Sequence, residues 1–268
     1  MAGSLLLVGC GKMGGALLDG WLKAGTMERI VVVEPSGLPP FAKPPQVVAA
    51  TGPHDLPAGF VPDVVVLAVK PQVMDQVVPA YAGLVRPETV FLSIAAGKPV
   101  GYFERHLGAS AAIVRAMPNT PAAVGRGITV CVGNANVAKP QADLCDALLR
   151  AVGDVAWIDD ESLMDAVTAV SGSGPAYVFL LVETLAKAGE AAGLSPGLAQ
   201  TLARATVAGS GELLRQSSAT AAQLREAVTS PNGTTQAALN VLMAPGAMDA
   251  LLARAVAAAA QRSKELAQ

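Results

Sequence analysis

Val8-Gly-Cys-Gly-Lys-Met-Gly-Gly-Ala16 follows the apolar run Leu5–Val8 near the start of the chain. Gly9, Gly11 and Gly14 have the spacing G-x-G-x-x-G, which by itself is a weak signal. Here the glycines stand between a strand-like run and an amphipathic helical segment, and in that context they indicate a dinucleotide-binding turn. Gly9 would permit the tight turn, Gly11 the approach of a pyrophosphate to the backbone, and Gly14 the packing of helix on strand, with free N–H groups at the helix start holding the pyrophosphate. A glycine-rich turn without a ligand is the alternative.

Strand-length apolar runs alternate with helical stretches through the first 160 residues. The runs are continuously apolar, which is typical of strands buried on both faces of a parallel sheet. Repeated strand–helix units predict right-handed crossovers and a doubly wound parallel α/β sheet. We expect strands at Ser4–Val8, Ile30–Glu34, Val64–Val69, Thr89–Ile94, Ala112–Arg115, Ile128–Val132 and Val155–Ile158, with helices at Lys12–Ala24, Pro71–Ala80 and Val137–Ala151.

The pattern changes near residue 160, where strand-like runs give way to Ala- and Leu-rich helical stretches. We therefore expect a sheet domain over residues 1–160 and an all-helical domain over residues 161–268. Leu180, Leu181 and Leu185 put apolar side chains on more than one helix face, so a partner subunit is expected to cover them. Tight packing against the sheet domain is the alternative. The expected helices are Pro175–Ala192, Pro196–Gln216, Ala221–Val228, Thr234–Leu242 and Ala247–Leu266.

Composition argues against several classes of protein. The formal net charge is −2 and Lys and Arg form no cluster, so nucleic-acid binding is not expected. No unbroken apolar run approaches the roughly 18 residues of a membrane-spanning helix, and the N-terminus lacks the basic start of a secretory signal. We expect a cytoplasmic protein without a membrane partner. Cys10, Cys131 and Cys145 are widely spaced, with only His54 and His106 as companions, which predicts reduced structural thiols and no metal site.

Three further segments end expected strands, at the edge where ligands of open α/β sheets bind. Glu34 ends the second strand, where a carboxylate commonly accepts hydrogen bonds from an adenosine ribose; a solvated acid is the alternative. The motifs L-A-V-K-P (Leu67–Pro71) and S-I-A-A-G (Ser93–Gly97) end two later strands. Lys70 has no catalytic partner nearby in sequence, so we expect it to contact a cofactor or lie on the surface.

Six motifs in order along the chain resemble the pyrroline-5-carboxylate reductase family over essentially the whole length. The first three are the glycine-rich motif G-C-G-K-M-G, L-A-V-K-P and S-I-A-A-G. The other three are R-A-M-P-N-T-P (Arg115–Pro121), S-G-S-G-P-A-Y (Ser171–Tyr177) and V-T-S-P-N-G-T-T (Val228–Thr235). The glycine-rich motif is shared by many dehydrogenases, whereas the last two are more particular to this family. The resemblance implies a Rossmann-type N-terminal domain and a helical domain that interlocks with its twin, giving at least a homodimer with the active site at the interface.

The resemblance also implies a reaction, hydride transfer from NADH or NADPH to the C=N carbon of 1-pyrroline-5-carboxylate, giving L-proline. The segment Ser230–Thr235 reads as a tight turn leading into a helix, whose free N–H groups bind an anion. By resemblance, the Thr235 hydroxyl meets the imine nitrogen; an ordinary helix cap is the alternative. Ser171–Tyr177 borders the active site or serves packing alone.

The expected site residues follow from these motifs. Those expected to bind the cofactor are Gly9, Gly11, Lys12, Met13, Gly14, Glu34, Ala68, Val69, Lys70, Pro71, Ala95, Ala96, Gly97 and Asn119. Those expected to bind substrate are Ser230, Asn232, Gly233, Thr234 and the catalytic Thr235.

Cofactor choice is predicted from Glu34, which departs from the small polar residues through which family members often accept the phosphorylated cofactor. A carboxylate repels a 2′-phosphate, and Asp55 is a second acid expected on the same side. NADH is therefore predicted to be preferred over NADPH.

Two other functions are weighed against the reductase. A hydroxyacid-type dehydrogenase of similar two-domain layout would use a helix lysine, but Lys187 and Lys264 stand in no recognisable catalytic setting. A catalytically silent, dinucleotide-binding regulatory protein would not need the intact turn at Thr235.

Overall fold

The computed structural model describes residues 3–43 and 45–266. Within them the chain forms two compact units, one reaching to Gly172 and resumed from Ala259, the other spanning Ser173–Ala258. Residues 161–172 and the end of the last helix therefore pack with the sheet.

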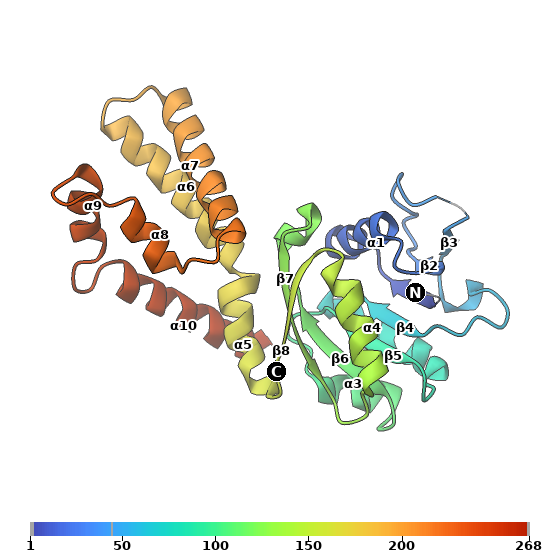
Figure 1. Cartoon of the computed structure of the whole chain (residues 1–268). Coiled ribbons are helices and arrows are strands. Elements are labelled where there is room, and N and C mark those ends of the chain that lie inside the picture. The colour runs from blue at the N-terminus through green and yellow to red at the C-terminus, as the bar shows by residue number, and fades with distance from the viewer. Residues whose placement is uncertain (1–2, 44, 267–268) are drawn as a thin grey trace. The chain divides into compact units, whose positions relative to one another are not determined.

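The first unit is built on a sheet whose strand order, among the described residues, is β3-β2-β1-β4-β5-β6-β7-β8 (Figure 1). The first six strands in this order are parallel, which confirms the predicted doubly wound α/β class. The strands are β1 Ser4–Val8, β2 Arg29–Val33, β3 Val47–Ala50, β4 Val64–Leu67, β5 Val90–Ser93, β6 Ala112–Met117, β7 Gly127–Gly133 and β8 Gly153–Trp157.

The expectation of a wholly parallel sheet was wrong at one edge, because β7 runs antiparallel to β6. Residues 118–126 connect the two strands, and a parallel crossover needs a dozen residues or more. The chain instead turns back through Gly125, which has φ 67° in the left-handed region. β8 then pairs parallel to β7 after the helix α4, Lys139–Arg150.

The core has two layers because successive side chains of each strand point to opposite faces of the sheet. Leu5 and Leu7 pack with helix α1, Lys12–Ala24, and with α4. The Trp21 indole of α1 donates a hydrogen bond to the carbonyl of Leu148 in α4, 2.9 Å away, so these two helices are tied together on that face.

Leu6 and Val8 face the other way and pack with Met74 of helix α2, Met74–Val77, and with Phe103 of α3, Val100–Leu107. Each fully buried side chain of this size contributes about 1.5–3 kcal/mol. The sheet unit therefore has a complete core within a single chain.

Three elements of this unit differ from expectation. Strand β3 was not predicted because the prolines around it read as loop, and the short helix α3 was not predicted because Gly101 interrupts its apolar pattern. The helix expected at Pro71–Ala80 is broken into α2 and flanking 3-10 turns at Pro71–Val73 and Val78–Leu84. Pro79 has no N–H to donate to the carbonyl of Asp75, four residues earlier, so the α-helical ladder cannot continue through it and the chain goes on as a 3-10 turn.

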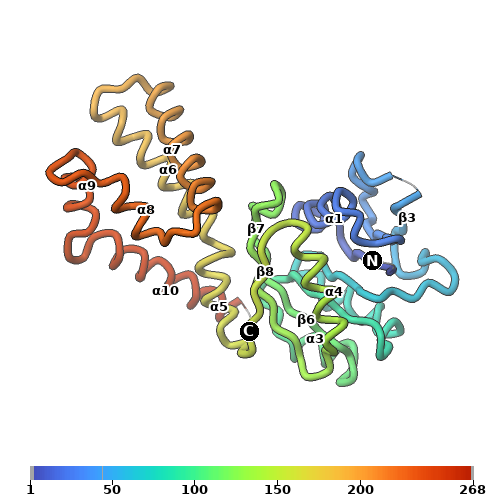
Figure 2. The backbone as a smooth tube through the Cα atoms, in the orientation of Figure 1, coloured from blue at the N-terminus to red at the C-terminus, as the bar shows by residue number. Residues whose placement is uncertain are grey.

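The helices of the second unit match the predicted ones closely. A helical run enters it through α5, Met164–Val167, and a π-helical turn at Thr168–Gly172 (Figure 2). The helices are α6 Gly174–Ala191, α7 Pro196–Gln216, α8 Ala221–Ala227, α9 Thr234–Leu242 and α10 Met248–Leu266, the last ending in the first unit. Of these, α6 packs along α7.

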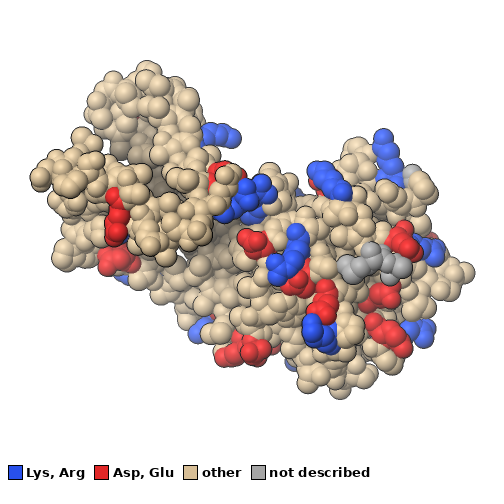
Figure 3. Space-filling view, in the orientation of Figure 1, with Lys and Arg blue, Asp and Glu red and all other residues tan. Residues whose placement is uncertain are grey.

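The second unit has little core of its own. Its buried apolar residues are Ala186, Ala199 and Ala203, whereas Phe179 is 61% and Leu180 56% exposed. In the view of Figure 3 most of the surface of this unit carries no charged side chain.

One described helical stretch, Glu161–Ala191, is long and apolar enough by length and composition to cross a membrane, and only 6% of its most apolar window is buried within the chain. The stretch is not an unbroken apolar run, because polar residues such as Ser171 and Glu183 interrupt it, and for that reason the sequence did not predict it as a candidate membrane span. The same features suit a helix covered by another subunit.

Candidate active site

The predicted cofactor segments meet at one edge of the sheet. Gly9, Glu34, Ala68 and the segment Ala95–Gly97 follow the carboxyl ends of β1, β2, β4 and β5, which are parallel neighbours. The Gly9 N–H donates to the Val33 carbonyl at 2.9 Å, which ties the first loop to the second strand. The strand order reverses at β1, the point where open α/β sheets bind their ligands.

Each of the three glycines of the loop occupies its position for a different physical reason. A Cβ on Gly14 would lie 2.4 Å from the carbonyl oxygen of Gly9, so the helix needs a glycine to approach the strand. Gly9 has φ 92° and its Cβ would lie 2.8 Å from the Val69 side chain. A Cβ on Gly11 would meet nothing within 4 Å, so no packing in this chain requires that glycine. The open space beside Gly11 fits the close approach of a ligand to the backbone.

Glu34 is held by the backbone at this edge. Its Oε2 accepts a hydrogen bond from the Cys10 N–H at 2.8 Å, and its Oε1 accepts one from the Ser36 N–H at 3.1 Å. The carboxylate therefore fixes the glycine-rich loop against the end of β2. Each oxygen keeps a lone pair that can accept a further hydrogen bond, as from a ribose hydroxyl.

Asp55 lies near the same edge, one strand further out. It follows β3, which pairs with β2 in parallel, and its carboxylate accepts hydrogen bonds from the N–H and hydroxyl of Thr51. These bonds lower the pKa of Asp55, the Thr51 hydroxyl contributing most and His54 adding to the effect. Asp55 is therefore an exposed anion, as the sequence placed it.

The cysteines are poor nucleophiles in this structure. Burial, with a smaller contribution from Glu34, raises the pKa of Cys10 to about 11, and burial raises that of Cys145 to about 12. Burial also raises the pKa of Cys131. All three are free thiols, and the described residues contain no group of three or more His, Cys, Asp or Glu side chains that could hold a metal ion.

An ion pair joins the segments that follow β4 and β5. Asp75 Oδ1 accepts a hydrogen bond from the Tyr102 hydroxyl at 2.7 Å, and the Lys98 ammonium lies 3.3 Å away. The Tyr102 bond, followed by Lys98, lowers the pKa of Asp75. The Lys98 ammonium also lies 4.3 Å from the centre of the Tyr102 ring. The loops carrying Lys70 and Gly97 are thus linked just outside the sheet edge.

A second ion pair stands on the other side of the Ala95–Gly97 loop. Arg115 is buried and donates to Glu161 Oε1 at 2.7 Å, and the same oxygen accepts from the N–H of Val100 at 2.8 Å. Sequence reasoning found Arg115 only as part of a motif and missed Glu161. The only signal for Glu161 was its position, an acid that begins a helical stretch just past the last strand.

Asn119 is braced by the protein. Its Oδ1 accepts from the N–H of Ile128 at 3.0 Å, and its Nδ2 donates to the carbonyl of Ser171 at 3.2 Å. A Cβ on Gly172 would lie 2.5 Å from the end of the Met117 side chain. The motifs R-A-M-P-N-T-P and S-G-S-G-P-A-Y therefore touch, and packing accounts for this part of both; contact of Asn119 with a cofactor stays a prediction.

The remaining cofactor residues line the same edge with different exposure. The Lys12 and Lys70 ammonium groups are exposed and form no ion pair with a described residue. Both can therefore face a phosphate. Met13 and Val69 are half-buried and pack on the two core layers, and Ala95 is buried beside the exposed Ala96.

The predicted substrate turn lies in the second unit, between α8 and α9. Asn232 has φ 58°, the positive value that a tight turn imposes on a residue able to tolerate it. The Gly233 N–H donates to the Ser230 carbonyl at 3.0 Å, which closes the turn. No described residue accepts from the N–H groups of Thr234 and Thr235. Two donors at a helix N-terminus are thus free for an anion.

The helix-cap alternative for Thr235 does not hold. The N-cap of α9 is Gly233, with no side-chain cap, so Thr235 stands in the first turn and not at the cap. Its hydroxyl has no hydrogen-bond partner among the described residues.

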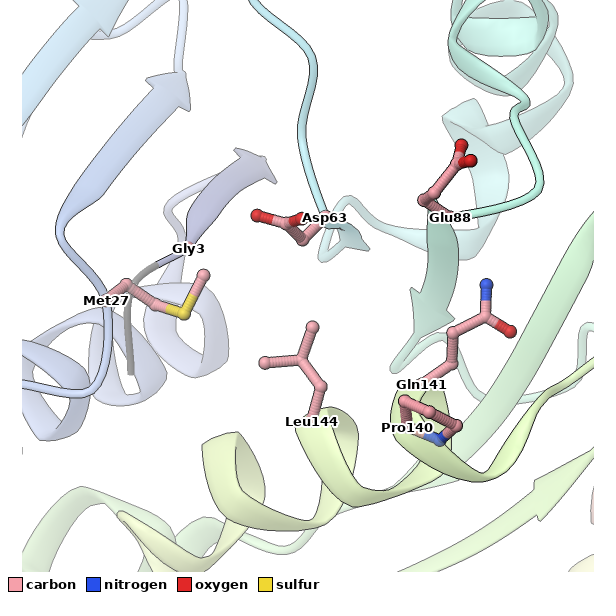
Figure 4. A pocket seen from close by; sticks show the side chains of 7 residues that line it. All are labelled: Gly3, Met27, Asp63, Glu88, Pro140, Gln141 and Leu144. Atoms are coloured by element: carbon pink, nitrogen blue, oxygen red, sulfur yellow. The ribbon is translucent and has the colours of Figure 1, made fainter.

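A pocket at the opposite edge of the sheet is a different place (Figure 4). Asp63 and Glu88 precede β4 and β5, and Leu144 comes from α4. Asp63 Oδ2 already accepts from the N–H of Ser4 at 2.7 Å. None of the predicted site residues lines this pocket.

Comparison with known proteins gives a family match for each part of the chain. Residues 161–266 match the family described as pyrroline-5-carboxylate reductase dimerisation, and residues 4–97 match the NADP oxidoreductase, coenzyme F420-dependent family. The chain is 41% identical to pyrroline-5-carboxylate reductase of Synechocystis sp. over 99% of both proteins. It is 48% identical to that of Pseudomonas aeruginosa over 77% of this chain and 75% of the relative.

Solved structures show the same likeness. The pyrroline-5-carboxylate reductase of Coxiella burnetii superposes with a TM-score of 0.91 at 34% identity, covering 99% of each chain. The Plasmodium falciparum pyrroline carboxylate reductase, solved with NADP bound, has a TM-score of 0.81 at 31% identity and covers 99% of this chain and 98% of its own.

Proposed function

The chain belongs to the pyrroline-5-carboxylate reductase family, and from this premise we propose which of its residues carry out the reaction. The reaction is the reduction of 1-pyrroline-5-carboxylate to L-proline, the last step of proline biosynthesis, at the expense of NADH or NADPH. The observation that carries the assignment of the site is the free hydroxyl and free N–H groups at the start of α9.

The proposed cofactor site is the edge formed by Gly9, Gly11, Glu34, Ala68–Pro71 and Ala95–Gly97. The open space beside Gly11 and the free ammonium groups of Lys12 and Lys70 fit a pyrophosphate. When bound there, the nicotinamide supplies the hydride. The apolar residues of these segments, Ala68, Val69, Pro71, Ala95 and Ala96, would keep water from the reacting face. Asn119, whose side chain is held by Ile128 and Ser171, is proposed to lie at the rim of the site.

The proposed substrate site is the turn Ser230–Thr235. The N–H groups of Thr234 and Thr235, which have no acceptor among the described residues, would hold the substrate carboxylate without a formal positive charge. The Thr235 hydroxyl would donate a hydrogen bond to the imine nitrogen, which makes the neighbouring carbon more electrophilic. Because a threonine hydroxyl is a poor acid, the proton comes from water or is already on the substrate.

We propose that the second unit is covered by a second copy of the chain. Its exposed apolar helices belong to the region that matches the dimerisation family. The helix Glu161–Ala191 would then be buried in a subunit interface, and a protein that stays in solution without detergent would exclude the membrane-spanning alternative.

We propose that NADH is preferred over NADPH. Glu34 keeps a carboxylate at the end of β2, with the exposed anion Asp55 one strand away. At ~4 Å and an effective dielectric near 20, each unit charge facing a 2′-phosphate costs about 4 kcal/mol before screening. The N–H groups of Cys10 and Ser36, which donate to Glu34, reduce that repulsion. The Plasmodium falciparum relative was solved with NADP, so an NADH preference would distinguish this chain from a member that binds the phosphorylated cofactor.

A cytoplasmic location is proposed with these assignments. Three free thiols, two of them buried, suit a reducing compartment.

Steady-state assay of the purified protein tests the function directly. We expect oxidation of NADH or NADPH only when 1-pyrroline-5-carboxylate is added, with proline as the product. A silent regulatory protein would bind the cofactor without turnover. A hydroxyacid dehydrogenase would instead reduce NAD(P)⁺ with a hydroxyacid.

A further inference from the structure

The loop between β5 and α3 carries Ala95–Gly97, and few hydrogen bonds hold it internally. The Ala95 N–H reaches the Ser93 hydroxyl at 3.3 Å, and Gly97 turns the chain with φ 73°. The place of the loop therefore depends on contacts from outside it. Between its ends these are the Ile94 N–H, which donates to the Leu67 carbonyl at 3.2 Å, and the exposed Lys98–Asp75 ion pair. The two ends are Ser93 in the sheet and Val100 at the first turn of α3.

Both ends lead to one carboxylate oxygen. Glu161 Oε1 accepts from the N–H of Val100 at 2.8 Å and from the Arg115 guanidinium at 2.7 Å. Arg115 is the direct partner of Ser93 in the register of β5 and β6. Glu161 thus reaches the far end of the loop directly and the near end through its strand neighbour.

We propose that Glu161 is a positioning residue that holds the Ala95–Gly97 loop in its cofactor-binding shape; this inference rests on the proposed cofactor site. α3 begins after Pro99 without a side-chain cap of its own, so Glu161 supplies the acceptor and the negative charge that a helix N-terminus favours. The Arg115 side chain is only 8% exposed and needs an anionic partner.

A loop that shifts by a fraction of an ångström misaligns the reacting ring and lowers the rate without removing any catalytic group. The effect should appear in cofactor affinity and in kcat. It should not appear in the affinity for the substrate, whose proposed contacts lie in the turn Ser230–Thr235.

The test compares Glu161→Gln with Glu104→Gln in the full-length protein. Glu104 is a half-buried carboxylate of α3. It accepts a hydrogen bond from the Asn134 side-chain amide at 3.0 Å and forms none with the Ala95–Gly97 loop. Nicotinamide fluorescence gives the Kd of NADH and of NADPH in the absence of substrate.

For Glu161→Gln we expect Kd to rise and kcat to fall about 10-fold each, as for one weakened charged hydrogen bond, with KM for pyrroline-5-carboxylate within about 2-fold. Glu104→Gln should leave all three values unchanged, and a wild-type Kd and kcat in Glu161→Gln would overturn the proposal.

A double variant separates positioning from stability. Arg115→Met with Glu161→Leu removes both charges, so no buried charge is left unpaired and the melting temperature should recover relative to Glu161→Gln. Leucine, unlike glutamine, offers the Val100 N–H no acceptor, so Kd should stay raised. Recovery of cofactor affinity along with the melting temperature would mean that the ion pair serves the fold alone. If the wild type failed to reduce pyrroline-5-carboxylate while Glu161→Gln still weakened cofactor binding, the proposed function would fall and the role of Glu161 would stand.

Discussion

The two units of the chain differ in where they keep their apolar side chains. In the sheet unit Leu5, Leu6 and Leu7 are fully buried between two helical layers of the same chain. In the helical unit Phe179 and Leu180, which are neighbours on α6 and point in different directions from it, are both more than half exposed. Successive residues on a helix point about 100° apart, so α6 is apolar on most of its circumference.

The comparison shows that an apolar sequence does not by itself make a core. The sheet unit can bury its strands because its own chain supplies a helix layer for each face. The helical unit has only α7 packed along α6 and needs a surface from elsewhere. Its stability should therefore depend on concentration, whereas that of the sheet unit should not.

The largest effect is expected from a charge in the exposed apolar surface of α6. Leu180→Glu would place an unpaired carboxylate in the proposed subunit interface, where desolvation costs several kcal/mol. We expect light scattering to show a single chain and activity to fall more than about 1,000-fold. Val61→Glu, at an apolar site of the sheet unit that is 47% exposed against 56% for Leu180, should change neither. A fully active dimer of Leu180→Glu would place the interface elsewhere.

Thr235 tests whether the helical unit also contributes to chemistry. Thr235→Ala should lower kcat about 10- to 1,000-fold, the range for one lost transition-state hydrogen bond, with little change in cofactor Kd. Because the hydroxyl caps no helix, the melting temperature should not change. Thr235→Ser keeps a hydroxyl and should recover most of the rate. A wild-type kcat in the alanine variant would remove Thr235 from the mechanism.

Two glycines in the sheet unit separate ligand approach from packing. Gly11→Ala should fold normally and weaken cofactor binding about 10- to 100-fold, or about 1.4–2.8 kcal/mol, because its Cβ enters only the open space beside the loop. Gly14→Ala should lower the melting temperature as well, since its Cβ would press on the Gly9 carbonyl, and overpacking costs about 1–3 kcal/mol. Equal melting temperatures for the two variants would contradict this division.

The smallest effect is expected in cofactor choice. Glu34→Ser should narrow the NADH preference but also free the Cys10 N–H, so affinity for both cofactors should fall. Glu34→Gln keeps an acceptor and removes the charge, and we expect it to shift the NADH to NADPH ratio of kcat/KM by about 5- to 30-fold, after screening of the Coulomb term. Asp55→Asn, at an exposed carboxylate, should shift it less. A wild type that prefers NADPH would mean that Glu34 does not face the 2′-position.

Much of the fold could be read from the sequence because local patterns decided it. Continuously apolar runs such as Val64–Leu67 predict buried parallel strands, and the helices after Gly174 were found with nearly correct bounds. The reversal at β7 was missed because strand direction depends on the length and turns of a connection, which apolar periodicity does not report. The helix at Pro71–Ala80 was overestimated because a proline near its end outweighed its helical pattern.

The candidate site divides in the same way. The sequence by itself determined the glycine-rich turn, the acid at Glu34 and the turn before Thr235, since each is a local motif whose backbone geometry follows from its own residues. Only the tertiary structure decided that one oxygen of Glu161 serves both Val100 and Arg115, because a hydrogen bond between residues 61 positions apart has no local signature. For the glycines the motif itself predicts that Gly14 serves packing and Gly11 the approach of a ligand. The tertiary structure adds the clearances: a Cβ on Gly14 would lie 2.4 Å from the Gly9 carbonyl oxygen and 3.2 Å from the Ala68 side chain, whereas one on Gly11 would meet nothing within 4 Å, because folding brings Ala68 beside the loop.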